Sequence, residues 1–198
     1  MEPMQTEERR LTVERNVPVD ALYMAFHMCS RNHPDYYAFD MLSDLLSSGR
    51  SSRFVQHLVQ DKQIFNSIDA YISGSIDNVF FHIVGKPAPE KTLEEAEKAI
   101  WEELALLTEG SIDENELEKV KNRYESEQIF NNLNYLNVAT NLAYFELIGK
   151  AEDINTEVEK YRSVTQEQIK RAAKQTFLPE NCSVLYYKAA AKDASHTP

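Results

Sequence analysis

The histidines are the first residues to consider for chemistry, because imidazole serves both as a metal ligand and as a general base. The chain has five: His27, His33, His57, His82 and His196. A catalytic zinc site usually needs two histidines one helical turn apart with a carboxylate base, yet neither H-E-x-x-H nor H-x-x-E-H occurs. His57 and Asp61 have a spacing more typical of a hydrogen bond on a helix surface than of a ligand set. The sequence therefore predicts no metal site in this chain.

Motifs for covalent catalysis and phosphate binding are missing too. No G-x-S-x-G elbow and no Gly-rich phosphate loop occurs, and neither Cys29 nor Cys182 stands beside a histidine. Both cysteines lie in apolar, strand-like runs and are expected to behave as small buried hydrophobes. The carboxylates of the run Glu94-Glu95-Ala96-Glu97 are expected to spread over the solvent face of a helix. We therefore predict no catalytic residue in this chain, so any chemistry must be completed by another domain.

Charge and hydropathy narrow the classes of partner. The formal net charge is −11, and no stretch is rich in Lys or Arg, which argues against a nucleic-acid partner. No apolar run is long enough to span a membrane, so we expect no membrane insertion. The chain is expected to be soluble and either cytoplasmic or periplasmic, since the cysteines do not fix the compartment.

Hydrophobic periodicity predicts strands and helices in a definite order. Strands are expected at about 10–17, 20–29, 64–73, 78–85 and 182–189, with Ile64, Asn66, Ile68 and Ala70 alternating in the third. The first helix is expected to begin at Pro34 and end at Gly49, and Ser51 or Ser52 is expected to cap a short helix containing Phe54 and Leu58. Further helices are expected from about 93 to Gly110, from about 113, and near 134–148, 153–162 and 165–177.

This order indicates an α+β fold, with an antiparallel or mixed sheet of about five to six strands and helices stacked on one face. A hairpin is expected between the third and fourth strands, around Gly74. We expect residues 1–9 to be linker, 10–190 to form one domain, and 191–198 to be a frayed tail.

One stretch is more informative than the rest. Residues 40–73 read DMLSDLLSSGRSSRFVQHLVQDKQIFNSIDAYIS and place a helix, a Gly-Ser turn, a second helix and a strand in succession. This segment resembles one found in the pitrilysin/insulinase-type (inverzincin) zinc metallopeptidases. The resemblance continues upstream through ALYMAFHMC and NHPDYYAFDMLSDLL, and downstream through VTQEQIKRAAKQTFLPENCSVLYYK. It therefore covers about 10–190.

The resemblance implies a protein built from two similar halves that close around an unfolded peptide. In that family the H-x-x-E-H motif belongs to the catalytic half, so this chain resembles the second, C-terminal, non-zinc half, of the pitrilysin/mitochondrial-processing-peptidase type. Zinc is then expected in a separate catalytic half, on the same polypeptide or a partner subunit. The isolated chain is expected to bind no zinc tightly and to have no peptidase activity.

The family's second half commonly offers an Arg, and a Tyr seven residues later, to hold substrate near the zinc. Aligning Ser52-Arg53-Phe54 with the family's S-R-L places Val59 and Asn66 at these positions. Valine cannot stabilise an oxyanion, and asparagine donates only a neutral hydrogen bond. Arg53 and Lys62 are nearby candidates to substitute for them, and the alternative is that both are ordinary helix-surface cations.

Three functions are compatible with these residues. The first is the non-zinc half of a zinc metallopeptidase, which encloses unfolded peptide against the catalytic half. The second is a catalytically inactive family member that acts as an assembly or peptide-binding subunit, which Val59 and Asn66 favour. The third is an unrelated α+β binding module, which requires the resemblance over 40–73 to be chance.

Overall fold

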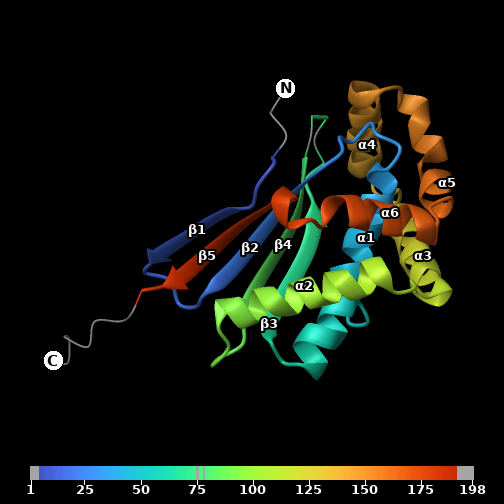
Figure 1. Ribbon diagram of the computed structural model, residues 1–198. Helices are drawn as coiled ribbons and strands as arrows, with labels where there is room; N and C mark the ends of the chain where they lie inside the picture. The colour runs from blue at the N-terminus through green and yellow to red at the C-terminus, as the bar shows by residue number, and fades with distance from the viewer. Residues whose placement is uncertain (1–4, 75, 78, 191–198) are drawn as a thin grey trace.

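The computed structural model describes residues 5–74, 76, 77 and 79–190. In this part of the chain one sheet forms one layer, and helices cover one of its two faces (Figure 1). Among the described residues, no helix covers the other face (Figure 1). This arrangement confirms the predicted α+β fold with helices stacked on one face.

The sheet has five strands in the order β1-β5-β2-β4-β3. They are β1 (Arg9–Arg15), β2 (Ala21–Met28), β3 (Phe65–Ile72), β4 (Val79–Pro87) and β5 (Cys182–Ala189). β1 and β5 are parallel, whereas β5, β2, β4 and β3 pair antiparallel, so the sheet is mixed, as predicted. β3 and β4 form the predicted hairpin, and the last strand of the chain is inserted between the first two.

The helices largely follow the predicted order. The α-helices are α1 (Tyr36–Ser47), α2 (Leu93–Glu109), α3 (Glu114–Asn131), α4 (Tyr135–Ile148), α5 (Glu157–Arg162) and α6 (Gln166–Thr176). Two 3-10 segments, η2 (Ala151–Thr156) and η3 (Pro179–Asn181), precede α5 and β5, and the short helix η1 (Phe54–Asp61) has π geometry. The single helix predicted over 153–162 is thus a 3-10 turn followed by α5.

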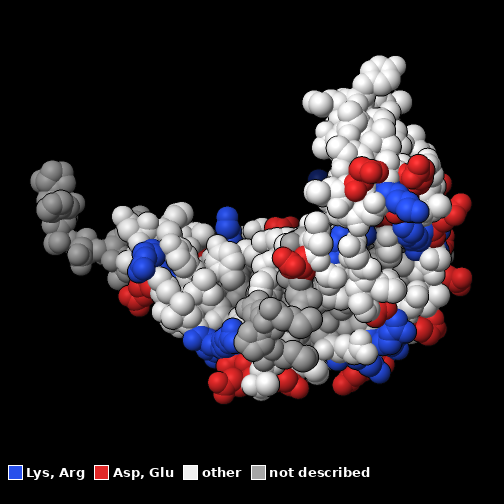
Figure 2. All heavy atoms as spheres, turned by 90° about the horizontal axis from the view of Figure 1, so that it is seen from above, with Lys and Arg blue, Asp and Glu red and all other residues white. Residues whose placement is uncertain are grey.

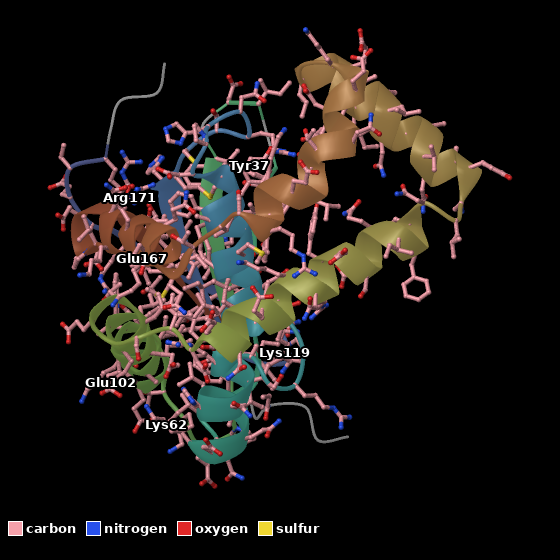
Figure 3. The ribbon with its side chains drawn as sticks, turned by 90° about the vertical axis from the view of Figure 1, so that its right-hand side faces the viewer. Tyr37, Lys62, Glu102, Lys119, Glu167 and Arg171 are labelled. Carbon is pink, nitrogen blue, oxygen red and sulfur yellow. The ribbon has the colours of Figure 1, made fainter. Side chains whose placement is uncertain are left out.

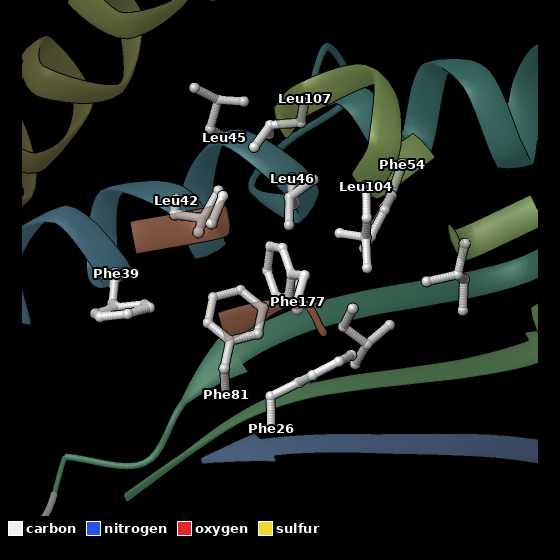
Figure 4. Close-up of a cluster of buried hydrophobic side chains, with 14 of the residues drawn as sticks. Phe26, Phe39, Leu42, Leu45, Leu46, Phe54, Phe81, Leu104, Leu107 and Phe177 are labelled. Atoms are coloured by element: carbon white, nitrogen blue, oxygen red, sulfur yellow. The ribbon is translucent and has the colours of Figure 1, made fainter. Parts of the chain in front are cut away.

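The core lies between the sheet and its helices (Figure 4). Phe26 from β2, Phe81 from β4 and Phe177 after α6 are buried, and the Phe177 ring packs edge-on against both others with centroids 5.1 Å apart. Leu42 and Leu104 bring α1 and α2 onto the same cluster. Full burial of each such side chain contributes about 1.5–3 kcal/mol, so this cluster fixes the helical layer to one face of the sheet.

Local signals explain several helix ends, and one predicted cap is wrong. Gly49 follows α1 with φ +87°, a left-handed conformation that favours glycine, so it ends the helix as predicted. Thr92 and Glu95 form a reciprocal capping box at the start of α2. Ser52, however, does not cap η1: its Oγ donates to the Gly49 carbonyl, 2.8 Å away, so the serine stabilises the turn before the helix.

The predicted alternation in β3 holds for Ile68 and Ala70 but fails at Asn66. A β-bulge between Phe65 and Ser67 shifts the register, so Phe65, Ile68 and Ala70 face the core while Asn66 is exposed. A bulge adds one residue to a strand and reverses the facing of the residues beyond it, which a simple two-residue period misses.

No helix within the described residues has the length and apolar character needed to cross a membrane. Residues 1–4 of the predicted linker 1–9, and the whole predicted tail 191–198, lie outside the described part of the chain. Of the described linker residues, Gln5 is buried and its Nε2 donates to the Cys182 carbonyl at 2.7 Å, and Arg9 already belongs to β1.

Candidate functional site

The sheet face without helices, here called the open face, carries an unusual number of apolar side chains. Side chains alternate along a strand, so those that do not enter the core point to this face. They include Leu11, Tyr23, Ala25, Tyr71, His82, Val84, Ser183 and Leu185. Leu11, Tyr23 and Tyr71 are 61%, 40% and 48% exposed. Contiguous exposed apolar surface of this kind marks an interaction site.

The open face is hollowed by a shallow cavity of about 410 Å³. Residues from β1, β2, β4 and β5 line it: Arg9, Arg10, Leu11, Tyr23, Met24, Ala25, His82, Val84, Ser183, Val184 and Leu185. Because it runs across neighbouring strands, the cavity offers a continuous surface to a ligand in extended conformation.

Aromatic contacts join side chains of neighbouring strands on the open face. Tyr71 stacks on His82 with centroids 5.0 Å apart, and Tyr23 meets Tyr187 edge-on at 6.4 Å. His27 lies 4.7 Å from Phe80 on the same face. Burial lowers the pKa of His82, so this imidazole is neutral at pH 7. The face therefore presents aromatic rings, alongside charged side chains such as Arg9, Asp69 and Lys86.

Val59 and Asn66, the predicted substrate-binding positions, lie at the edge of the sheet. Val59 on η1 is partly buried and packs against the core, so it is held by its neighbours. Asn66 sits in the β3 bulge and is exposed. Val59 is aliphatic and Asn66 is a neutral amide, so neither side chain is a cation.

The two predicted substitutes are engaged in ion pairs. Arg53 donates from Nε and Nη2 to the two carboxylate oxygens of Glu116 at 2.9 Å each, a bidentate pair that links η1 to α3. Its side chain is 13% exposed. Lys62 Nζ lies 3.6 Å from Glu102 Oε2 on α2, and both side chains are partly exposed (Figure 3). Hydrogen bonds to Glu116 raise the pKa of Arg53, so the guanidinium stays charged.

The remaining polar groups do not assemble a metal site. Across the described residues, no three or more His, Cys, Asp or Glu side chains are placed to hold a metal ion. His57 does not bond Asp61 as predicted: its Nδ1 lies 2.8 Å from Oε1 of Glu103, which is buried in α2. The wider π winding of η1, in which Lys62 N donates to the His57 carbonyl, turns the imidazole toward α2. Zinc therefore does not fit the residues present.

A second exposed apolar surface lies on the α3–α4 hairpin, formed by α3, α4 and the turn between them. No charged residue occurs from Gln128 to Phe145. The exposed apolar side chains here are Ile129, Phe130, Leu133, Tyr135, Leu136, Leu142 and Leu147. The hairpin projects from the body of the molecule beyond the open face and walls one side of a concave surface (Figures 2 and 3). Its tip carries few charged side chains in Figure 2.

A buried polar cluster around Glu97 was not predicted from the sequence. Glu97, expected to face solvent, is 6% exposed. It accepts hydrogen bonds from Arg10 at 2.5 and 2.9 Å, Tyr186 at 2.6 Å and Trp101 at 3.2 Å. Burial alone would raise the pKa of Glu97, but these bonds outweigh it and lower the pKa. The nearby Trp101, one helical turn away, was the only local signal for this site.

Three comparisons place the fold among known proteins. Residues 1–124 match the family model of the peptidase M16 inactive domain. The chain is 23% identical over 188 residues to the zinc protease PqqE of Helicobacter pylori, covering 94% of this chain and 42% of that protein. A crystal structure of a protease from Helicobacter pylori is similar with a TM-score of 0.88 and 22% identity, covering 94% of this chain and 45% of that chain. The chain thus spans less than half the length of these two relatives.

An inactive peptidase domain from Bordetella parapertussis is similar over nearly its whole length. The TM-score is 0.80 at 16% identity, with 94% of this chain and 98% of that chain covered. At this identity the likeness concerns the fold. It includes the mixed sheet and the helices on one face.

Proposed function

Because this chain belongs to the peptidase M16 inactive-domain family, we propose that it is the non-zinc half of a zinc metallopeptidase. In this role it encloses an unfolded peptide against a separate catalytic half, which supplies the zinc. The observation that carries the proposal is the open face: an apolar and aromatic sheet surface with a cavity of about 410 Å³, on a domain whose described residues assemble no metal site.

The character of the open face suits enclosure better than chemistry. Its rings and neutral His82 offer apolar contact area to a peptide, and its pleat accepts an extended backbone. Closure of such a face over a substrate excludes water, which strengthens the electrostatic interactions that the catalytic half makes with the reacting carbonyl. The domain then contributes by confining the peptide.

The α3–α4 hairpin supports the need for a partner. Its uncharged tip leaves Tyr135 92% and Leu133 74% exposed, and the hairpin projects on the side of the open face (Figure 3). Burial of this apolar surface against the catalytic half would release water and favour association. It would also set the distance between the two halves. Under this proposal the hairpin is a contact between halves, and the open face remains free for the peptide.

The test is reconstitution. The chain is combined with a half that carries H-x-x-E-H, on the same or a separate polypeptide, and zinc-dependent cleavage of unstructured peptides is measured. We expect turnover that requires both halves and is abolished by a chelator. Turnover by the catalytic half alone at the same rate would contradict the proposal.

A second candidate function, a catalytically inactive subunit for assembly or peptide binding, is favoured by Val59 and Asn66. Neither side chain supplies a cation to an oxyanion, and Arg53 and Lys62 are paired with Glu116 and Glu102. In this case the reconstituted protein would bind unfolded peptide without cleaving it. Peptide binding and turnover, measured on the same preparation, distinguish the two functions.

A further inference from the structure

A separate cavity of about 330 Å³ lies inside the angle between α3 and the segment α4–η2–α5. Its volume is at the lower end of the range typical of small-molecule sites. The floor is formed by Arg31, Tyr36, Asp40 and Tyr161, and the walls by residues of α3, α4 and α5. None of these residues belongs to the open face, so the cavity has no part in the proposed enclosure of peptide.

The floor carries a carboxylate without a cationic partner. Asp40 on α1 accepts a hydrogen bond from the Tyr161 hydroxyl, and it forms no ion pair with any described residue. Burial raises the pKa of Asp40, and the Tyr161 hydrogen bond and the nearby Arg31 offset this rise only in part. The side chain is only half-buried, so it is still reached from the cavity. A positive group that enters the cavity would meet this carboxylate.

The guanidinium of Arg31 shows how a cation packs against tyrosine rings beside this position. The Arg31 guanidinium lies over the ring of Tyr36 at 4.4 Å and over that of Tyr37 at 5.3 Å. Arg31 pairs with buried Glu157, which also accepts from the Tyr37 hydroxyl at 3.1 Å. Glu157 also lies 3.7 Å from Lys160 Nζ. Among the residues that line the cavity, two carboxylates, Asp40 and Glu157, therefore face one guanidinium, that of Arg31.

Aromatic and amide side chains complete the walls. Tyr124 stacks on Tyr161 with centroids 3.6 Å apart, and Tyr144 lines the cavity from α4. Asn131 and Asn141 line it as well, and their side chains make no hydrogen bond to another described residue. Tyrosine faces attract cations through their quadrupole, and free amides accept or donate further hydrogen bonds. Together with Asp40 they match a flat or tetrahedral organic cation.

We propose that this cavity binds an organic cation, a guanidinium or alkylammonium group, with Asp40 as its counter-ion and tyrosine faces as its walls. The group could belong to a free small molecule or to a basic side chain of a polypeptide. This inference does not rest on the proposed peptidase role.

The test is calorimetric titration of the full chain with Nα-acetyl-arginine amide and with Nα-acetyl-citrulline amide, which is nearly isosteric and neutral. We expect one saturable site for the arginine compound with a Kd below about 1 mM, and at least about tenfold weaker binding of the citrulline compound. Asp40→Asn should weaken the arginine compound about tenfold. Asp69→Asn, at an exposed position of β3, should leave its Kd unchanged and serves as the matched control.

Two further measurements keep the test decisive. Tyr144→Leu, which removes one wall without touching Asp40, should weaken the arginine compound severalfold, and circular dichroism verifies that each variant is folded. A peptide with one central Arg and its citrulline counterpart separate the sources: tighter binding of the Arg peptide than of the small compound assigns the site to polypeptides, and equal binding assigns it to small molecules. Equal affinity for arginine and citrulline compounds, or no binding up to about 10 mM, would overturn the proposal.

Discussion

Three acidic side chains on the helices are held by partners that lie elsewhere in the fold. Glu97, Glu103 and Asp40 all sit in helices with ordinary acidic character, yet each is held in or near the core by partners distant in sequence. Helical periodicity indicates only roughly which side of a helix a residue occupies. It cannot show that Arg10, 87 residues away, reaches Glu97. The partners follow from tertiary packing.

The His57–Glu103 pair gives a residue-scale prediction. The Glu103 side chain is 1% exposed, and its Oε2 has no hydrogen-bond partner, so His57 is its main compensation. His57→Ala leaves the carboxylate buried without a partner and should lower the free energy of unfolding by about 2 kcal/mol. Urea denaturation measures this. His33→Ala, at an exposed position, should change it by less than about 0.5 kcal/mol, and equal losses in both variants would refute the role of the pair.

Asp44 gives a prediction on pH. Burial and the neighbouring Asp40 raise the pKa of Asp44 from 3.8 to about 6. The folded state therefore holds this proton more tightly than the unfolded state, so the stabilisation is full below about pH 3.8 and is lost as the pH rises through about 6. Asp44→Asn should raise the free energy of unfolding by about 2 kcal/mol near pH 7.5 and change it little near pH 4.

The measurement is denaturation of the Asp44→Asn variant and the unaltered chain at both pH values. Asp61→Asn, at an exposed position, is the control and should show no such pH dependence. A gain in stability that is the same at both pH values would contradict the assignment.

The helices and strands were predicted well because their apolar residues recur at regular spacing. The apolar positions in α1, α2 and α6 recur at helical spacing, and Gly49 and Gly110 mark ends that the structure confirms. What failed were departures from regular winding: the bulge in β3, the π geometry of η1 and the 3-10 turn before α5. Such irregularities depend on neighbours across the fold, so a local pattern does not reveal them.

The bulge makes an element-scale prediction at Gly85 of β4. The Phe65 ring, brought inward by the bulge, covers Gly85 so closely that an added Cβ would lie 2.3 Å from the ring. Gly85→Ala should lower the free energy of unfolding by about 1–3 kcal/mol through forced repacking. Gly74→Ala, where the nearest atom is the tip of the Tyr36 side chain at 3.3 Å, should cost less. Comparable losses measured by thermal unfolding would show that the Phe65 contact does not matter.

The whole molecule is asymmetric: helices cover one face of the sheet and leave the other open (Figure 1), and the α3–α4 hairpin projects on the open side (Figure 2). The sequence resemblance indicated the family and predicted Val59 and Asn66 as the substrate-binding positions. It did not give the open face, because exposed and buried apolar residues look alike in a strand. The cavity near Asp40 was likewise invisible, since its walls come from β2–α1, α3, α4 and α5.

The α3–α4 hairpin gives a prediction at this scale. Leu133→Ser at its tip should weaken association with the catalytic half by about tenfold without lowering stability, since the side chain is 74% exposed. Leu106→Ser, an exposed leucine on α2, is the matched control and should not change association. Analytical ultracentrifugation of separately expressed halves measures both. Unchanged association of the Leu133 variant would exclude the tip from the interface.

Site-specific photo-cross-linking shows whether the open face contacts the unfolded peptide. A photoreactive residue is placed at Tyr23 on the open face or at Leu106 on the helical side, in the chain assembled with its catalytic half, and a labelled unstructured peptide is added. We expect strong cross-linking to the peptide from position 23 and only background from position 106. Equal cross-linking from both positions, or none from position 23 while the peptide is bound, would contradict this expectation.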